Sequence, residues 1–148
     1  KVTVGPLPQR FLVKFVGSRP CSGLWGSKHT REPVDNMVQE LRQMDKKDDL
    51  PLINFKIQED GIKMAVHPKS CSSKKFSECT FIPLHFISYA VQDYRYSKLF
   101  VFILVREMSS KIKVTECHAY LCDGMVSCRQ MSLSMADAFK KLELRVKD

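Results

Sequence analysis

The stretch Glu116-Cys117-His118-Ala119-Tyr120-Leu121-Cys122, together with the segment that follows it, decides the fold of this chain. We predict a β-strand over 113–122, because short runs rich in apolar residues are typical of strands. From 126 to 146, apolar side chains recur at intervals of three and four, which predicts a helix with one apolar stripe. That stripe consists of Cys128, Met131, Met135, Phe139, Leu142 and Val146. We therefore expect the chain to end as a strand that leads into a long helix.

Upstream of this unit, the sequence predicts one further helix and six further strands. The helix is expected over 33–44, with Pro33 in its first turn, where the missing N–H costs nothing. A loop with Pro20, Gly23 and Gly26 is expected over 18–30. Its Trp25 is interpreted as a packing anchor, with a ligand contact as the less common alternative for a loop tryptophan. The strands are predicted over 11–17, 52–58, 62–66, 80–84, 86–91 and 98–106.

The order strand, helix, six strands, helix predicts a mainly β member of the α+β class. Polar segments over 67–77 and 92–97 are expected to be loops, and Glu59-Asp60-Gly61 predicts a hairpin turn with Gly at positive φ. Short hairpin connections favour antiparallel pairing. We expect a flexible N-terminal segment over 1–9 and a single domain over 10–148.

Composition narrows the class of protein. The chain has 148 residues, of which 44% are hydrophobic and 27% charged, enough for one domain with a hydrophobic core. No apolar run approaches the ~20 residues that a membrane span needs. Residues 1–8 lack the apolar region of a signal peptide. The chain does not begin with Met, so we expect it to be part of a longer protein.

The net charge of +8 favours anionic partners such as phosphate groups, acidic peptides or anionic lipid. Nucleic acid is another anion, but the sequence has no helix rich in Arg and Lys and no aromatic motif of the ribonucleoprotein type. A nucleic-acid binder would therefore rest on net charge alone, and we do not expect one.

The cysteines and histidines do not form a pattern typical of a disulfide framework, a metal site or a catalytic site. We expect reduced thiols in a cytoplasmic protein, because the spacings do not resemble a secreted disulfide framework. Neighbouring Cys117 and His118 on a strand point to opposite faces, which argues against a zinc site and a Cys–His nucleophile. No phosphate-binding Gly loop or Ser elbow is present. We expect neither an enzyme nor a metal or cofactor. The six cysteines are Cys21, Cys71, Cys79, Cys117, Cys122 and Cys128.

Four segments between 11 and 144 resemble motifs of the phosphotyrosine-binding domain family, also called phosphotyrosine interaction domains. They are Lys14-Phe15-Val16-Gly17, Ile82-Pro83-Leu84-His85-Phe86-Ile87-Ser88-Tyr89-Ala90, the Cys117–Cys122 run, and Ser134-Met135-Ala136-Asp137-Ala138-Phe139-Lys140. Each motif is weak alone, and their order and spacing carry the resemblance. It implies the pleckstrin-homology (PH) superfold: a seven-stranded antiparallel sandwich or open barrel, capped by a C-terminal helix, with an extra helix between the first two strands.

The resemblance also implies a non-catalytic adaptor that binds the cytoplasmic tail of a receptor or signalling protein. A peptide with an Asn-Pro-x-Tyr-like motif would add as an antiparallel strand to the fifth strand, beside the C-terminal helix. Phe139 is expected both to close the barrel and to touch the peptide. The expected peptide-binding residues are Ile87, Ser88, Tyr89, Ala90, Val91, Met135 and Phe139.

Phosphate recognition depends on arginine. Phosphotyrosine-dependent members carry Arg before the first helix and Arg just ahead of the Cys-His pair, whereas Thr115 and Glu116 precede Cys117 here. Without a clear bidentate arginine clamp, we expect binding without a strict need for phosphotyrosine. A basic rim could still be built from Lys28, Arg31, Arg106, Lys111 and Lys113.

The alternative function is a PH-like module that binds phosphoinositide headgroups and is recruited to the membrane periphery. Its candidate residues are Lys69, Lys74 and Lys75 in the loop after the third strand. A solvated loop accounts for them better, because single lysines bind anionic lipid weakly. The same superfold hosts both functions, so the fold alone does not separate them.

Overall fold

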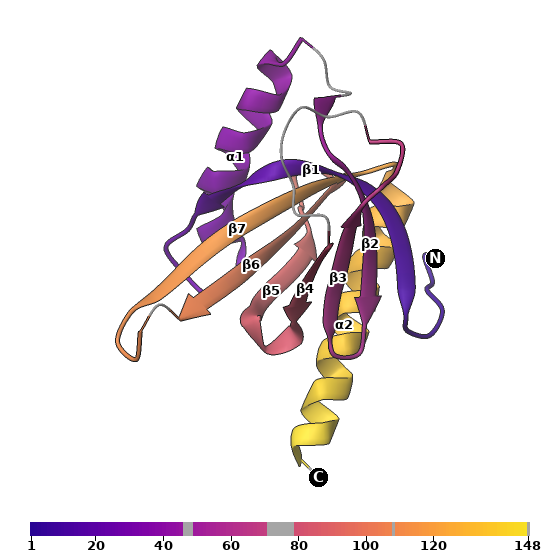
Figure 1. The fold of residues 1–148 in the computed structure, drawn as a ribbon, viewed down its shortest axis with the longest axis vertical. Coiled ribbons are helices and arrows are strands. Elements are labelled where there is room, and N and C mark those ends of the chain that lie inside the picture. Colours follow the sequence, from indigo (N-terminus) through magenta and orange to yellow (C-terminus); the bar gives the residue numbers. More distant parts are fainter. Residues whose placement is uncertain (46–48, 71–78, 108, 148) are drawn as a thin grey trace.

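The computed structural model describes residues 1–45, 49–70, 79–107 and 109–147. Within these residues, seven antiparallel strands form one sheet in the order β4-β3-β2-β1-β7-β6-β5 (Figure 1). Two α-helices complete the fold, one between β1 and β2 and one at the C-terminal end. The elements are β1 (Gln9–Pro20), α1 (Ser27–Gln43), β2 (Leu52–Gln58), β3 (Gly61–Val66), β4 (Cys79–Pro83), the 3₁₀ turn η2 (Leu84–Phe86), β5 (Ile87–Gln92), β6 (Leu99–Glu107), β7 (Lys113–Cys122) and α2 (Met125–Lys147).

The sheet is open, because its two outer strands are not paired with each other. Among the described residues, β4 pairs only with β3 and β5 only with β6, while η2 carries the chain from one outer strand to the other. The predicted fold class, an antiparallel open barrel with a helix after its first strand and a C-terminal helix, is confirmed. Both outer strands present a main-chain edge, which gives the molecule two places for strand addition.

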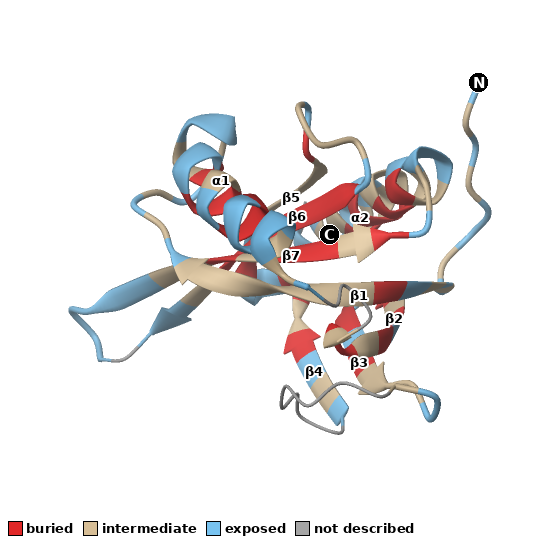
Figure 2. Ribbon diagram, turned by 90° about the horizontal axis from the view of Figure 1, so that it is seen from above, coloured by how far each residue is buried: buried red, intermediate tan, exposed pale blue. Residues whose placement is uncertain are grey.

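The helices cover opposite faces of the sheet, as the burial pattern shows (Figure 2). On β6, alternation sends Phe100 and Phe102 into the larger core with α2, and Leu99 and Val101 into a smaller core with α1. β6 is buried on both faces for this reason, which explains its continuous apolar sequence.

The start of the fold differs from the prediction of a loop over 18–30. β1 runs on to Pro20, because its second half pairs with β7 after an irregularity between Phe15 and Gly17. α1 begins at Ser27, so Pro33 lies inside the helix and not in its first turn. Long-range pairing with β7 extends the strand, and that pairing leaves no local signal in the sequence.

The hairpin between β2 and β3 is confirmed, with Glu59 and Asp60 at its tip. Gly61 is the first residue of β3, and a Cβ atom there would lie 2.1 Å from the carbonyl oxygen of Ile82 in β4. Glycine is required by this close approach of the neighbouring main chain.

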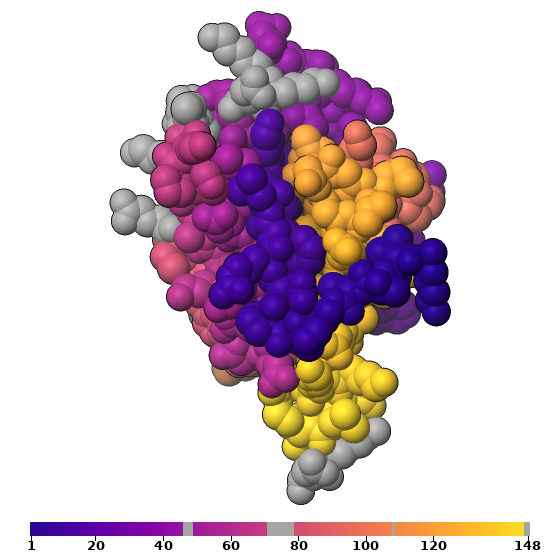
Figure 3. All heavy atoms as spheres, turned by 90° about the vertical axis from the view of Figure 1, so that its right-hand side faces the viewer, coloured from indigo at the N-terminus to yellow at the C-terminus, as the bar shows by residue number. Residues whose placement is uncertain are grey.

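α2 carries the predicted apolar stripe with one exception. Cys128, Met131 and Met135 are buried, and Phe139 and Leu142 pack partly against the same core. Val146 was expected to pack in the core, but it is 77% exposed, because the last turns of α2 extend beyond the sheet (Figures 1 and 3). Among the described residues, neither helix combines the length and apolarity needed to cross a membrane.

The segment before β1 contacts the domain. The Thr3 carbonyl accepts a hydrogen bond of 3.1 Å from Gln130 Nε2 of α2, and Leu7 packs against the larger core. Figure 3 shows this segment lying across the body of the molecule beside α2.

Candidate functional site

β5 is an edge strand whose main chain faces outward at alternate residues. The N–H group of Asp93 donates to the Leu99 carbonyl at 2.9 Å, so this residue faces β6. Main-chain groups alternate in direction along a strand, so Val91 and Tyr89 also face β6. The N–H and C=O groups of Ala90 and Gln92 therefore face away from β6, on the side where no other described strand pairs.

The side chains of β5 divide between the two faces of the sheet. Ile87 is buried in the larger core, and Ala90 packs against it. Tyr89 is half-buried, and its burial, followed by the nearby charge of Asp93, raises the pKa of its phenol. The expected edge thus offers mainly backbone to a partner, and Ile87 cannot contribute its side chain.

Ser88 is an extra residue in the pairing of β5 with β6. The register shifts between Ile87, opposite Leu104, and Tyr89, opposite Ile103. Such a bulge re-aims a side chain, and the exposed Ser88 hydroxyl donates a hydrogen bond to the Leu24 carbonyl in the loop between β1 and α1. The start of β5 is therefore fixed to that loop.

α2 runs alongside β5 and antiparallel to it. The carbonyl of its first residue, Met125, accepts a hydrogen bond of 3.3 Å from Gln92 Nε2 at the end of β5. Its later residue Leu142 lines the same small cavity as Leu84 of η2. Met125 and Phe139 are separated by about 21 Å of helix, and β5 is about 17 Å long. Phe139 consequently lies level with the start of β5.

Met135 and Phe139 were both expected to bind the peptide, but only Phe139 reaches the surface. Met135 is fully buried and can only support its neighbours from beneath. Phe139 is half-buried, packs against the larger core and keeps part of its ring at the surface.

The two flanks of α2 differ in what they face. Lys141 lies 3.3 Å from Glu59 Oε1 in the β2–β3 hairpin, and Arg145 lies on the same flank, 3.7 Å from Glu59 Oε2. The helical repeat places Phe139 on the opposite flank, together with Ser132 and Ala136. These two small residues leave room beside Phe139. Their spacing from it, i−7 and i−3, was a signal in the sequence that our prediction missed.

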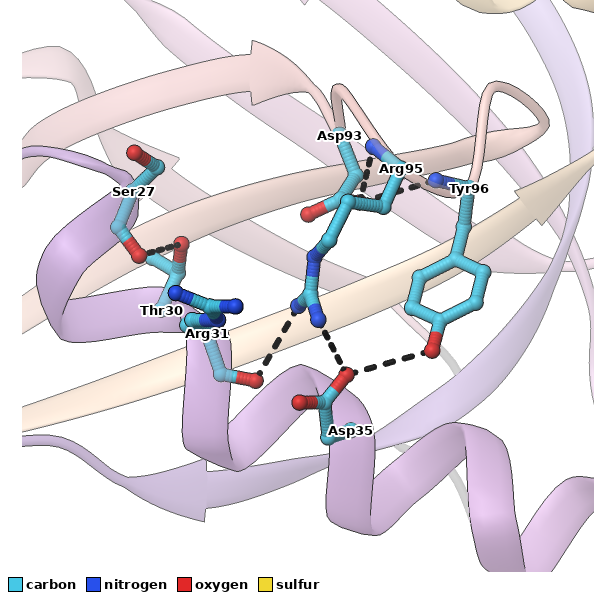
Figure 4. A network of polar contacts seen from close by, with 7 residues as sticks. All are labelled: Ser27, Thr30, Arg31, Asp35, Asp93, Arg95 and Tyr96. Carbon is cyan, nitrogen blue, oxygen red and sulfur yellow. Dashed lines mark hydrogen bonds and ion pairs between the residues drawn. The ribbon is translucent and has the colours of Figure 1, made fainter.

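A polar network holds the other end of β5 against α1 (Figure 4). Arg95 donates to Asp35 Oδ1 at 2.6 Å and to the Arg31 carbonyl at 3.2 Å, and Tyr96 donates to the same Asp35 oxygen at 3.1 Å. The buried Asp93 carboxylate accepts the N–H groups of Arg95 and Tyr96, both at 2.9 Å. Because both ends of β5 are fixed, its outer edge is preorganised.

The predicted basic rim falls into two separate groups. Lys28 and Arg31 lie on the first turns of α1, whereas Arg106, Lys111 and Lys113 lie at the far end of the β6–β7 hairpin. No described contact joins the two groups.

Arg106 is occupied within its own hairpin. Its Nε donates to Glu116 Oε1 at 2.9 Å, and His118 Nε2 lies 3.6 Å from the same oxygen. Burial opposes ionisation of Glu116, but the Arg106 hydrogen bond and the neighbouring His118 outweigh it and lower the pKa of this carboxyl. The residue ahead of the Cys-His pair is therefore a carboxylate that neutralises Arg106.

The predicted lipid-binding lysines are only partly described. Lys69 is exposed in the turn after β3, and its N–H donates to His67 Nδ1 at 3.0 Å. Lys74 and Lys75 lie outside the described residues.

Cys117 and His118 lie on opposite faces of β7, as strand alternation predicted, and Cys122 lies on the same side as His118. Cys117 points into the α1-side core, whereas His118 stacks on Phe102 on the other face, with ring centroids 4.9 Å apart. Burial raises the pKa of the Cys117 thiol to about 12. A hydrogen bond with Cys128 and burial raise the pKa of Cys122 further still. These thiols are protonated and weakly nucleophilic at neutral pH.

A large cavity lies away from this edge. It has a volume of about 800 Å³ and lies between β4 and the ends of β6 and β7, with Phe81, Ile82, Leu104 and Tyr120 among its walls. No residue of β5 or α2 lines it, so this cavity is separate from the candidate edge.

Comparisons with known proteins identify the fold. Comparisons with protein-family models and with curated proteins give no match. Among solved structures, the chain is similar to the C-terminal phosphotyrosine interaction domain of APBB2 from mouse, with a TM-score of 0.64 and 19% sequence identity. The similarity covers 93% of each chain. This chain therefore has the PH-like fold of a phosphotyrosine interaction domain.

Proposed function

We propose that this chain is a non-catalytic adaptor module that binds an extended peptide by adding it as an antiparallel strand to β5, beside α2. The peptide would come from the cytoplasmic tail of a receptor or signalling protein and carry an Asn-Pro-x-Tyr-like motif. The observation that carries the proposal is the outward-facing main chain of Ala90 and Gln92 on an edge strand that is held at both ends.

Strand addition fits this edge for a physical reason. An extended peptide satisfies outward N–H and C=O groups without demanding a particular sequence, so main-chain bonds supply affinity. Specificity then comes from side chains beside the strand, of which Phe139 is the largest on the adjacent flank of α2. Ser132 and Ala136 are small enough to let a strand lie between α2 and β5.

We further propose that phosphorylation is not required. A phosphate reader uses arginines that can form bidentate, charge-assisted hydrogen bonds. Arg106 already bonds to Glu116, and no described contact joins it to Lys28 or Arg31 of α1. Phosphoinositide binding remains an alternative from the sequence, and no contact of the described residues favours it. We also propose a cytoplasmic location, because the tail peptide that this module would bind is itself cytoplasmic.

A pair of peptides tests the proposal. Asn-Pro-x-Tyr peptides, unphosphorylated and phosphorylated, are titrated into the protein while calorimetry records affinity and amide NMR records the site. We expect both to bind with similar affinity and to shift resonances of 87–92 and of the Phe139 region. A strong preference for the phosphorylated peptide would contradict phosphate independence, and shifts confined to other surfaces would contradict the β5 site.

Binding to vesicles that contain phosphoinositide distinguishes the adaptor function from the alternative, a membrane-targeting module. Binding to such vesicles without binding to either peptide would replace the adaptor proposal with membrane targeting. A peptide with the same composition in scrambled order is the matched control, because it keeps the charge and removes the motif.

A further inference from the structure

The loop between β1 and α1 carries two exposed apolar side chains. Trp25 is 72% exposed and Leu24 is 48% exposed. A tryptophan side chain offers one of the largest apolar surfaces of any residue, and leaving it in water forgoes the stabilisation that burial would bring. The expected role of Trp25 as a packing anchor is therefore wrong within this domain.

This loop is held in place and is attached to the proposed binding edge. The N–H group of Cys21 donates to the Thr115 carbonyl at 3.1 Å, and Thr115 Oγ1 donates back to the Cys21 carbonyl at 2.5 Å. The Ser88 hydroxyl of β5 donates to the Leu24 carbonyl. The residue next to Trp25 is thus bonded to the start of the strand that would receive the peptide.

The direction of strand addition determines which part of a peptide would reach this loop. In an antiparallel pair the peptide runs opposite to β5, so its C-terminal part lies towards Ser88. Each residue advances the peptide by about 3.3 Å. A strand that pairs with Gln92 and Ala90 therefore arrives within a few residues at Ser88, whose hydroxyl is bonded to the Leu24 carbonyl.

We propose that Leu24 and Trp25 form a specificity surface for the bound peptide, contacting large apolar residues that follow its Asn-Pro-x-Tyr-like segment. The proposal rests on the proposed function and adds the chemistry of the peptide residues after the motif. Phe139 approaches the same end of β5 from the α2 side, so the peptide would leave the edge between Phe139 on one face and Trp25 on the other. We assign the Leu24 and Trp25 surface to the bound peptide because it is continuous with the β5 edge to which the peptide would add.

The test uses two peptides that differ only after the motif. Both contain unphosphorylated Asn-Pro-x-Tyr, followed by Leu-Phe in one and by Ser-Ser in the other. We expect the apolar peptide to bind about tenfold more tightly, which is the effect of a buried aromatic contact. Trp25 is the only tryptophan in the chain, so the apolar peptide should also shift its fluorescence to shorter wavelength.

Variants separate failure of this inference from failure of the proposed function. Trp25→Ala should lose the tenfold preference, retain binding of the Ser-Ser peptide and keep the parental melting temperature, because the side chain is mostly exposed. Val146→Ala, which removes an exposed apolar residue at the far end of α2, should keep the preference. If both peptides bind the parent equally, or Trp25→Ala keeps the preference, the specificity surface is refuted while strand addition stands. If neither peptide binds the parent, the proposed function fails and this inference fails with it.

Discussion

Replacing Phe139 with alanine should separate peptide binding from stability. A fully buried Phe→Ala change costs about 3–5 kcal/mol, and Phe139 is only half-buried, so about 2 kcal/mol of unfolding free energy should be lost. In a domain of this size that lowers the melting temperature by roughly 4–8 °C. An aromatic contact at the centre of an interface is worth about 2 kcal/mol, so peptide affinity should fall about thirtyfold.

Leu142 supplies the matched control, because it is also half-buried and packs against the same core. Leu142→Ala should lose a similar amount of stability, seen by calorimetric melting, and should bind the unphosphorylated peptide as the parent does. Both variants must be measured well below their melting temperatures, so that the folded fraction is the same. Equal peptide affinity in folded Phe139→Ala and parent would refute the assignment of Phe139 to the binding site.

Three further predictions follow from the structure. Lowering the pH from about 7.5 to about 5.5 should destabilise the fold. Burial keeps the pKa of His118 low in the folded protein, so the unfolded chain takes up a proton on this histidine at a higher pH than the folded protein does. Melting curves of His118→Gln should show a smaller pH effect, whereas those of His85→Gln, at an exposed histidine, should follow the parent. Gly61→Ala should cost more than about 2 kcal/mol in urea unfolding, because its Cβ would meet the Ile82 carbonyl oxygen, and parental stability would show that β4 moves freely. Ala90→Pro should stay folded and lose peptide binding, because its N–H faces away from β6; a folded variant that binds normally would count against strand addition.

Sequence patterns predicted the elements whose signals are local. Alternation predicted β2, and a short apolar-rich run predicted β7, both with their observed bounds. The apolar stripe predicted α2 to within a residue at each end. The same alternation placed Cys117 and His118 on opposite faces, which the structure confirms. These features depend on the period of the strand or helix and not on distant partners.

Features created by distant parts of the chain could not be predicted in the same way. The second half of β1 is a strand because it pairs with β7, about a hundred residues further along the chain. The loop that carries Trp25 is attached to β5 by a bond between Leu24 and Ser88, which are 64 residues apart in the chain. The direction of the main-chain groups at Ala90 depends on the register of β5 with β6, including the bulge at Ser88.

The sequence predicted where the candidate site lies, but the structure changes which side chains a peptide can reach there. The structure places α2 beside β5 and leaves Phe139 half-buried, whereas the Met135 and Ile87 side chains are buried beneath the surface. The prediction included every residue from Ile87 to Val91 in the peptide-binding edge, without dividing them by face. Burial and direction divide them into those that support the edge and those that a peptide can reach.

Amide hydrogen exchange along β5 tests the central claim most directly. In the free protein, the amides of Ala90 and Gln92 should exchange quickly, because they face away from β6, while those of Tyr89 and Val91 should be protected. Adding the unphosphorylated Asn-Pro-x-Tyr peptide should protect Ala90 and Gln92 and leave the other two unchanged. Peptide binding without new protection at Ala90 and Gln92 would contradict strand addition to β5.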